Sequence, residues 1–131
     1  MQATETITAV ILAGGRGRRM GGRDKGLLPL AGQPLVAHTV AAVRPQVDRV
    51  LVNANRELAR YRALGLPVVP DTLPDQPGPL AGVLTALEQT EAGLVLTVPC
   101  DVPRLPPDLV ARMRAALDAA GTDLCTVHDG T

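Results

Sequence analysis

Near its start the chain reads Ile7-Thr8-Ala9-Val10-Ile11-Leu12-Ala13-Gly14-Gly15, an almost unbroken apolar run that closes on a pair of glycines. A short run that is apolar at successive positions is typical of a strand buried on both faces of a parallel sheet. Similar apolar runs follow at residues 47–52, 68–69, 94–98 and 124–127. The sequence therefore predicts five strands.

Segments with helical periodicity lie between these runs, at residues 35–43, 57–64, 80–87 and 107–117. Alternation of strands and helices favours a three-layer α/β/α fold with a mainly parallel sheet, in which right-handed crossovers put the carboxyl ends of the strands along one edge. The sequence has no low-complexity linker and no internal repeat, so we expect residues 1–131 to form a single domain.

The composition excludes several classes of protein. Thirteen positive and thirteen negative side chains cancel, and Tyr61 is the only aromatic residue. Nucleic-acid binders need a basic surface, and single-strand binders also need stacking aromatics, so we expect no nucleic-acid partner. No apolar run approaches the roughly 20 residues that cross a bilayer, and residues 1–8 lack the features of a signal peptide. We therefore expect a cytoplasmic protein with no membrane partner.

The cysteines and histidines are isolated in the sequence. Cys100 and Cys125 have no Cys-x-x-Cys spacing, so we expect reduced, buried thiols. No histidine lies near Cys100 in the sequence, which argues against a nucleophilic role for its thiol. We expect His38 and His128 to be ordinary surface or capping residues.

Polar or glycine residues follow the ends of four predicted strands: Gly14-Gly15, Asn53, Asp71 and Asp101. Open α/β sheets bind ligands in the crevice outside the carboxyl ends of their strands. Asn and Asp are also common in turns and helix caps, but four such strand ends in succession favour a binding site.

Glycine and positive charge are concentrated in residues 14–26, which hold six of the thirteen glycines and five of the thirteen positive side chains. Converging backbone N–H groups and several cations suit a polyphosphate. The alternative is a flexible surface loop, which is disfavoured because the cluster directly follows a buried strand. A P-loop is excluded, since Gly26 follows Lys25 where Ser or Thr is required. The dinucleotide fingerprint fails as well, since Met20 stands at its sixth place counted from Gly15.

The residues from Leu12 to Gly22, followed by Asp24-Lys25, resemble the signature of nucleotidyltransferases that make nucleoside-diphosphate-linked products. Later blocks make the chain similar to the molybdenum cofactor guanylyltransferase (MobA) family. These blocks are Val52-Asn53-Ala54-Asn55-Arg56, Pro70-Asp71, Pro77-Gly78-Pro79-Leu80-Ala81-Gly82 and Pro99-Cys100-Asp101-Val102-Pro103. The first motif alone also fits cytidylyl-, uridylyl- and adenylyltransferases. The resemblance implies a Rossmann-like nucleotidyltransferase fold.

The resemblance also implies an activity. Members of the family transfer GMP from GTP to the terminal phosphate of molybdopterin, forming the guanine dinucleotide cofactor and pyrophosphate, and they require Mg²⁺. The chain is thus expected to be a GTP-binding, magnesium-dependent transferase of molybdenum cofactor biosynthesis. Its expected partners are GTP, Mo-molybdopterin and proteins of molybdoenzyme maturation, and we expect a monomer or a weak oligomer.

Charge neutralisation and in-line positioning are the main tasks in this reaction. Lys25 is placed to contact the phosphates as a compact cation, with Arg19 as a second, whereas Arg16, Arg18 and Arg23 are solvated loop charges in the simpler interpretation. By resemblance the backbone of Leu12, Ala13 and Gly14 lines the nucleotide pocket, and the loop from Gly15 onward covers the triphosphate.

Three more residues complete the predicted site. Asp101 follows an apolar run, where a carboxylate can hold Mg²⁺ beside substrate phosphates, and the resemblance assigns it the same role. The alternative is a capping Asp before a turn. Guanine offers N1–H and N2–H as neighbouring donors, so an oxygen of Asn53 or Asp71 could read it. The resemblance marks both as nucleotide contacts and leaves open which touches the base.

Residues 77–82 are predicted to form a rigid turn that leads into a helix N-terminus, which could bind a phosphate of either substrate. The alternative is an ordinary turn before a helix with no binding role.

Family members continue for several tens of residues beyond the position of Thr131, so the C-terminal part of the family's domain is expected to be absent. We therefore expect a retained GTP pocket with weakened or absent transfer. The alternatives are a related nucleotidyltransferase acting with CTP or on a sugar phosphate, and a non-catalytic nucleotide-binding module.

Lys25 is the only lysine beside twelve arginines, and it lies within the glycine-rich cluster. Arg presents a broad planar fork where Lys presents a compact point charge. Lys25→Arg is therefore expected to lower nucleotide affinity more than Arg16→Lys does, as measured by titration calorimetry. Equal affinities of the two variants would make Lys25 an ordinary surface charge.

Overall fold

The computed structural model describes residues 6–13, 25–71, 80–90, 93–102 and 104–127. Within them, a parallel sheet has the strand order β5-β4-β1-β6. Its strands are β1 (Ile7–Leu12), β4 (Arg49–Asn53), β5 (Val68–Val69) and β6 (Leu94–Pro99). Four of the five predicted strands are thus confirmed, and the pairing is parallel throughout this sheet.

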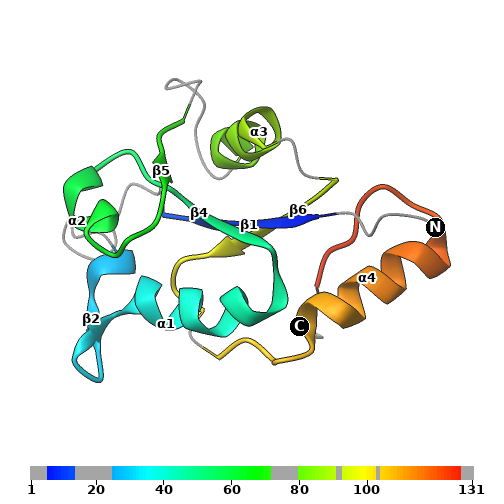
Figure 1. Cartoon of the computed structure of the whole chain (residues 1–131), viewed down its shortest axis with the longest axis horizontal. Helices are drawn as coiled ribbons and strands as arrows, with labels where there is room; N and C mark the ends of the chain where they lie inside the picture. The colour runs from blue at the N-terminus through cyan, green and yellow to red at the C-terminus, as the bar shows by residue number, and fades with distance from the viewer. Residues whose placement is uncertain (1–5, 14–24, 72–79, 91–92, 103, 128–131) are drawn as a thin grey trace.

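Helices lie on both faces of this sheet. They are α1 (Leu35–Val43), α2 (Leu58–Arg62), α3 (Leu80–Gln89) and α4 (Leu109–Ala120), with short 3₁₀ turns η2 (Lys25–Leu27) and η3 (Arg44–Gln46). Figure 1 shows α3 on one side of the sheet and α1 and α4 on the other. The predicted three-layer α/β/α architecture is confirmed. No helix in these described ranges is long and apolar enough to cross a membrane.

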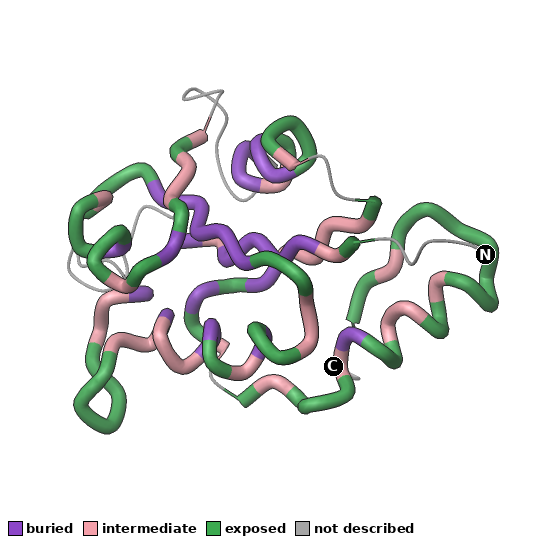
Figure 2. The backbone as a smooth tube through the Cα atoms, in the orientation of Figure 1, coloured by how far each residue is buried: buried purple, intermediate pink, exposed green. Residues whose placement is uncertain are grey.

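The side chains of β1 contribute to two apolar clusters, one on each face of the sheet. Ala9 and Ile11 are fully buried in a cluster that includes Val36, Val40 and Val43 of α1. On the other face, Val10 belongs to a cluster with Leu51 of β4 and Ala86 of α3. Figure 2 shows the buried residues concentrated along β1 and β4. Because both faces of β1 are covered, an almost continuous apolar run is needed there.

The fifth predicted strand, at residues 124–127, is wrong. These residues form no strand, and the exposed fractions of Leu124 and Val127 are 79% and 62%. An apolar run makes a strand only where a neighbouring backbone completes its hydrogen bonds. Among the described residues, this segment has no such ladder, although β6 ends the sheet on its side.

Local backbone geometry accounts for the other differences. The helix predicted from residue 57 begins at Leu58, because Glu57 has a left-handed φ of 54°. The helix predicted from residue 107 begins at Leu109, after Asp108. An unpredicted hairpin pairs β2 (Pro29–Leu30) with β3 (Gln33–Pro34). Its tight turn needs positive φ at Ala31 and Gly32, which have 53° and 82°, and alanine rarely signals such a turn.

Thr8 of β1 is 1% exposed, and its hydroxyl has no hydrogen-bond partner among the described residues. Thr8→Val keeps the branched shape and removes this unpaired group, so the free energy of unfolding should rise by about 1 kcal/mol in urea titrations. Thr39→Val is the matched control. The Thr39 hydroxyl donates to the Cys100 carbonyl at 3.0 Å, so the same change should be destabilising there. A lower free energy of unfolding in Thr8→Val would contradict the interpretation that the Thr8 hydroxyl is buried at a cost.

Candidate functional site

The four parallel strands end at nearly the same level. Leu12, the last residue of β1, is in register with Asn53 of β4 and Pro99 of β6, and Asn53 is in register with Val69 of β5. These paired residues, Val69, Asn53, Leu12 and Pro99, form a row that crosses the whole sheet at its carboxyl edge. The residues that follow each strand are placed along this edge.

Backbone hydrogen bonds extend the row one residue further. The Ala13 N–H donates to the Asn53 carbonyl at 2.7 Å, and the Cys100 N–H donates to the Leu12 carbonyl at 3.2 Å. Ala13 and Cys100 are both buried. Ala13 and the turn that contains Asp101 therefore lie next to each other at this edge of the sheet.

Asp71 lies two residues beyond β5, and two asparagines of the segment at the end of β4 hold it. Asn53 Nδ2 donates to Asp71 Oδ1 at 2.8 Å and to the Val69 carbonyl at 3.1 Å. Asn55 Nδ2 donates to Asp71 Oδ2 at 2.9 Å, and the Asp71 N–H donates to Asn55 Oδ1 at 2.8 Å. Asn53 is 2% exposed, whereas Asp71 is half-buried. Asn55 was part of a motif but was not predicted as a site residue.

Helix α3 packs directly on this end of the sheet through Gly82. A Cβ at Gly82 would lie 2.5 Å from Asn53 Oδ1 and 2.9 Å from Leu12 Cδ2. Only a glycine lets the helix backbone come this close to the Asn53 amide. The structure describes α3 from Leu80 onward, and the contacts of Gly82 place this end of the helix at the carboxyl edge of the sheet.

At the other end of the row, η2 packs on the turn after β6. A Cβ at Gly26 would lie 3.3 Å from both Cβ and Sγ of Cys100 and 2.5 Å from the hydroxyl of Tyr61, which is fully buried. Gly26 follows Lys25, and Cys100 precedes Asp101. The packing therefore brings the backbone at Lys25 to the turn that carries Asp101. The role of Tyr61 was missed, although its being the only aromatic residue was a signal.

Asp101 lies in this turn with an exposed side chain. The Thr39 hydroxyl of α1 holds the turn through its bond to the preceding carbonyl. The described residues contain no group of three His, Cys, Asp or Glu that could enclose a metal ion. A single accessible carboxylate still fits Mg²⁺, which commonly binds through one or two carboxylates plus waters and substrate phosphates.

The structure thus gathers Leu12, Ala13, Asn53, Asp71 and Asp101 along one edge. The other predicted contacts, Gly14, Gly15, Arg19 and the side chain of Lys25, lie outside the description. The same holds for Arg16, Arg18, Arg23, residues 77–79 and His128.

The surroundings of the cysteines and of His38 largely agree with the predictions made from the sequence. Neither cysteine forms a disulfide within the described residues, and Cys100 is buried as expected. Cys125 is only half-buried, which corrects the expectation, because its segment lies at the surface rather than in a strand. His38 Nε2 lies 2.6 Å from the Leu30 carbonyl of the β2–β3 hairpin, so its role is structural.

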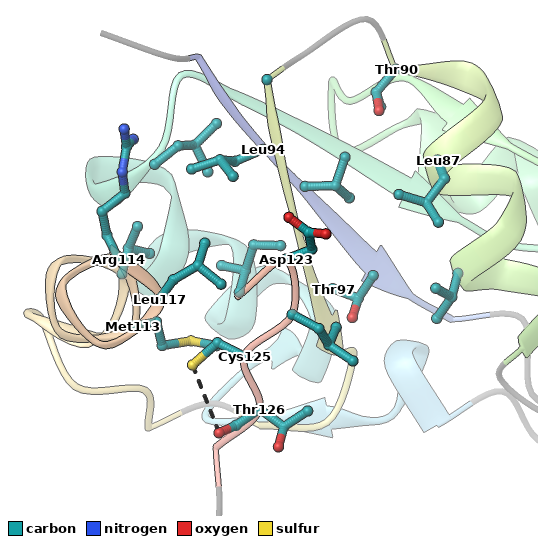
Figure 3. A pocket seen from close by; sticks show the side chains of 17 residues that line it. Leu87, Thr90, Leu94, Thr97, Met113, Arg114, Leu117, Asp123, Cys125 and Thr126 are labelled. Carbon is teal, nitrogen blue, oxygen red and sulfur yellow. Dashed lines mark hydrogen bonds between the residues drawn. The ribbon is translucent and has the colours of Figure 1, made fainter. Parts of the chain in front are cut away.

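An apolar groove of about 370 Å³ lies elsewhere, along β6 between α3 and α4. Figure 3 shows Leu87 of α3, Leu94 of β6 and Leu117 of α4 lining it, with the Cys125 segment closing one side. None of the predicted site residues lines this groove. Its apolar walls are unsuited to a triphosphate, so the groove is not the candidate nucleotide site.

Comparison with known proteins decides the family. Residues 9–131 match the model of the MobA-like NTP transferase domain. The chain belongs to this family. The match runs through all the strand ends described above, from β1 to β6, so the carboxyl edge of this MobA-like domain is shared by the family model.

The relatives are longer than this MobA-like chain. It is 53% identical over 124 residues to a molybdenum cofactor guanylyltransferase of Cupriavidus pinatubonensis, covering 95% of the chain and 62% of the relative. It is 54% identical over 128 residues to a protein of the same name from Methylibium petroleiphilum, covering 98% of the chain and 63% of the relative. The chain spans less than two thirds of the length of these relatives.

Solved structures agree on the fold. A nucleotidyl transferase from Methanothermobacter thermautotroptrophicus is 26% identical with a TM-score of 0.65, covering 84% of this chain and 57% of that one. A CMP:2-keto-3-deoxy-manno-octonic acid synthetase complexed with CTP is 17% identical with a TM-score of 0.69, covering 91% of this chain and 49% of that one. At that identity the second likeness shows the fold alone, so it does not indicate which nucleotide this MobA-like domain binds.

The close approach of Gly26 to Tyr61 predicts a non-additive pair of substitutions. Gly26→Ala should lower the free energy of unfolding by about 1–3 kcal/mol, because the new methyl group overlaps the Tyr61 hydroxyl. Tyr61→Phe removes that oxygen, so in the double variant the Gly26→Ala change should be less destabilising. The measurement is a double-mutant cycle by chemical denaturation. Strictly additive losses would show that the overlap is relieved by other movements.

Proposed function

We propose that the protein transfers GMP from GTP to the terminal phosphate of molybdopterin, releasing pyrophosphate and forming the guanine dinucleotide cofactor. Membership of the MobA-like family and the names of its relatives support this activity. A cytoplasmic location and a further contact with proteins of molybdoenzyme maturation are parts of the same proposal.

The observation that carries the proposal is the separation of two carboxylates along one edge. Asp71 and Asp101 each lie two residues beyond the strands that end the sheet order on either side, β5 and β6. Three strand spacings, about 14 Å, separate those two strands. One extended ligand can therefore contact Asp71 with its nucleoside and reach the Asp101 turn with its phosphates.

The reaction needs the attacking phosphate, the α-phosphate and the pyrophosphate leaving group held in line with their charges neutralised. Lys25 begins η2 beside the Asp101 turn. We propose that it contacts the triphosphate, with Arg19 as a second cation and the loop that includes Gly14 and Gly15 over the phosphates. Asp101 would hold Mg²⁺, which when bound supplies further neutralisation of the phosphate oxygens.

Nucleotide binding separates this function from its alternatives. The protein should bind GTP more tightly than CTP, UTP or ATP in titration calorimetry with Mg²⁺. Tighter binding of CTP than of GTP would contradict the proposed guanylyl transfer. Tight GTP binding without pyrophosphate release on addition of molybdopterin, in a version extended to the length of the relatives, would identify a non-catalytic binding module.

The role of Asp101 has a readout that does not depend on turnover. In the wild-type protein, removal of Mg²⁺ by chelation should weaken GTP binding, because the phosphates then lose a shared cation. Asp101→Asn should lose most of this dependence. In a version extended to the length of the relatives it should also reduce transfer by about a hundredfold, since a metal contributes several kcal/mol of charge stabilisation.

Asp108→Asn is the matched control, because it makes the same change at an exposed residue preceding α4. It should behave like the wild type. If Asp101→Asn kept the full magnesium dependence, another group would have to hold the ion.

A further inference from the structure

Asn55 forms a closed ring of hydrogen bonds with Asp71. It accepts from the Asp71 backbone N–H at 2.8 Å and donates through Nδ2 to Asp71 Oδ2 at 2.9 Å. One amide side chain thus holds both the backbone and the carboxylate of Asp71. This contact joins the segment after β4 to the segment after β5.

The second carboxylate oxygen is held from the end of β4. Asn53 Nδ2 donates to Asp71 Oδ1 at 2.8 Å and also to the Val69 carbonyl at 3.1 Å. On its other side the Asn53 amide oxygen is close to Gly82 of α3. The backbone carbonyl of Val69 can only accept a hydrogen bond, so the Asn53 amide nitrogen must face it, which fixes which way this amide points.

The two asparagines together determine the rotation of the Asp71 carboxylate. A contact to one oxygen alone leaves the group able to turn about that contact, whereas contacts to both oxygens do not. An ionised carboxylate has about four acceptor positions, so, counting the side-chain contacts of the described residues, one position on each oxygen remains after the two amide bonds. Asp71 is half-buried, so part of its surface is open to a ligand.

We propose that Asn55 is a positioning residue for guanine recognition. It holds the Asp71 carboxylate so that its two remaining acceptor positions face the adjacent N1–H and N2–H donors of guanine. Asn55 acts through Asp71 and not by touching the nucleotide itself. This inference rests on the nucleotide function proposed above.

Inosine triphosphate is the probe for this role, because it retains N1–H and lacks the exocyclic amino group. In the wild type, GTP should bind more tightly than inosine triphosphate. Asn55→Ala should lower GTP affinity about tenfold, the usual effect of losing a hydrogen bond to a charged group, and should lower the affinity for inosine triphosphate much less. Both affinities are measured by titration calorimetry with Mg²⁺, with the melting temperature recorded for each variant.

Gln46 offers a matched control far from the site. Its amide donates to the carbonyls of Ala42 and Pro106 at 3.0 and 2.9 Å, and it accepts from the Val110 N–H at 2.9 Å. Gln46→Ala should lower the melting temperature without changing the preference for GTP over inosine triphosphate. A general loss of stability is thereby separated from a loss of positioning.

A swap of the two partners gives a second test. Asn55→Asp places a carboxylate against Asp71 and should lose more GTP affinity than Asn55→Ala. The double variant N55D/D71N restores a donor facing an acceptor, so its melting temperature should recover. Its GTP preference should not recover, because the carboxylate has moved to the other residue.

Equal losses for GTP and inosine triphosphate in Asn55→Ala, unchanged GTP affinity, or recovery of GTP preference in the swap would overturn the positioning role. A wild type that binds GTP over CTP but does not distinguish inosine triphosphate would also overturn it and leave the proposed function standing. A wild-type protein with no preference for GTP over CTP would contradict both the positioning role of Asn55 and the proposed guanylyl transfer.

Discussion

β1 is hydrogen-bonded to parallel strands along both edges and is covered by helices on both faces. The positions of the described candidate site residues depend on it. Its last residue fixes the level at which β4 and β6 end, because the register runs through Leu12 to Asn53 and to Pro99. Any shift of β1 would move Ala13, the asparagines and the Asp101 turn relative to one another. The apolar run at the start of the chain thus organises a polar site.

The site is assembled by close packing as much as by polar groups. Gly82 lets α3 approach the Asn53 amide, and Gly26 lets η2 approach the turn at Cys100. Each glycine removes a side chain at the point where two elements meet. The first contact supports the part of the site near Asp71, and the second supports the part near Asp101. A ligand that spans the edge would depend on both.

Much of the fold could be predicted from sequence, because apolar periodicity directly reports burial. The run at β1 and the helix at α1 were placed with the bounds that the structure has. Residues 124–127 have the same kind of pattern and still form no strand, since a strand also needs a neighbouring backbone, which a sequence pattern does not reveal. The turn at Ala31 was missed for a related reason, because its positive φ is imposed by the hairpin rather than favoured by alanine.

The candidate site divides in the same way. Asn53, Asp71 and Asp101 could be predicted because parallel strands bring their carboxyl ends together. The part played by Asn55 could not, since it depends on two hydrogen bonds between segments that are separate in the chain. The contact of Gly26 with Tyr61 is likewise a tertiary contact: Tyr61 is conspicuous as the only aromatic residue, but the sequence does not reveal which residue it contacts.

Tyr61 is the only aromatic residue of the chain, and its ring is fully buried beside Gly26 and the turn after β6. All the aromatic absorption and fluorescence of the protein therefore come from one ring at one place. Its spectrum is an intrinsic optical reporter of the junction between the phosphate side of the site and the core, with no label and no background from other aromatic groups.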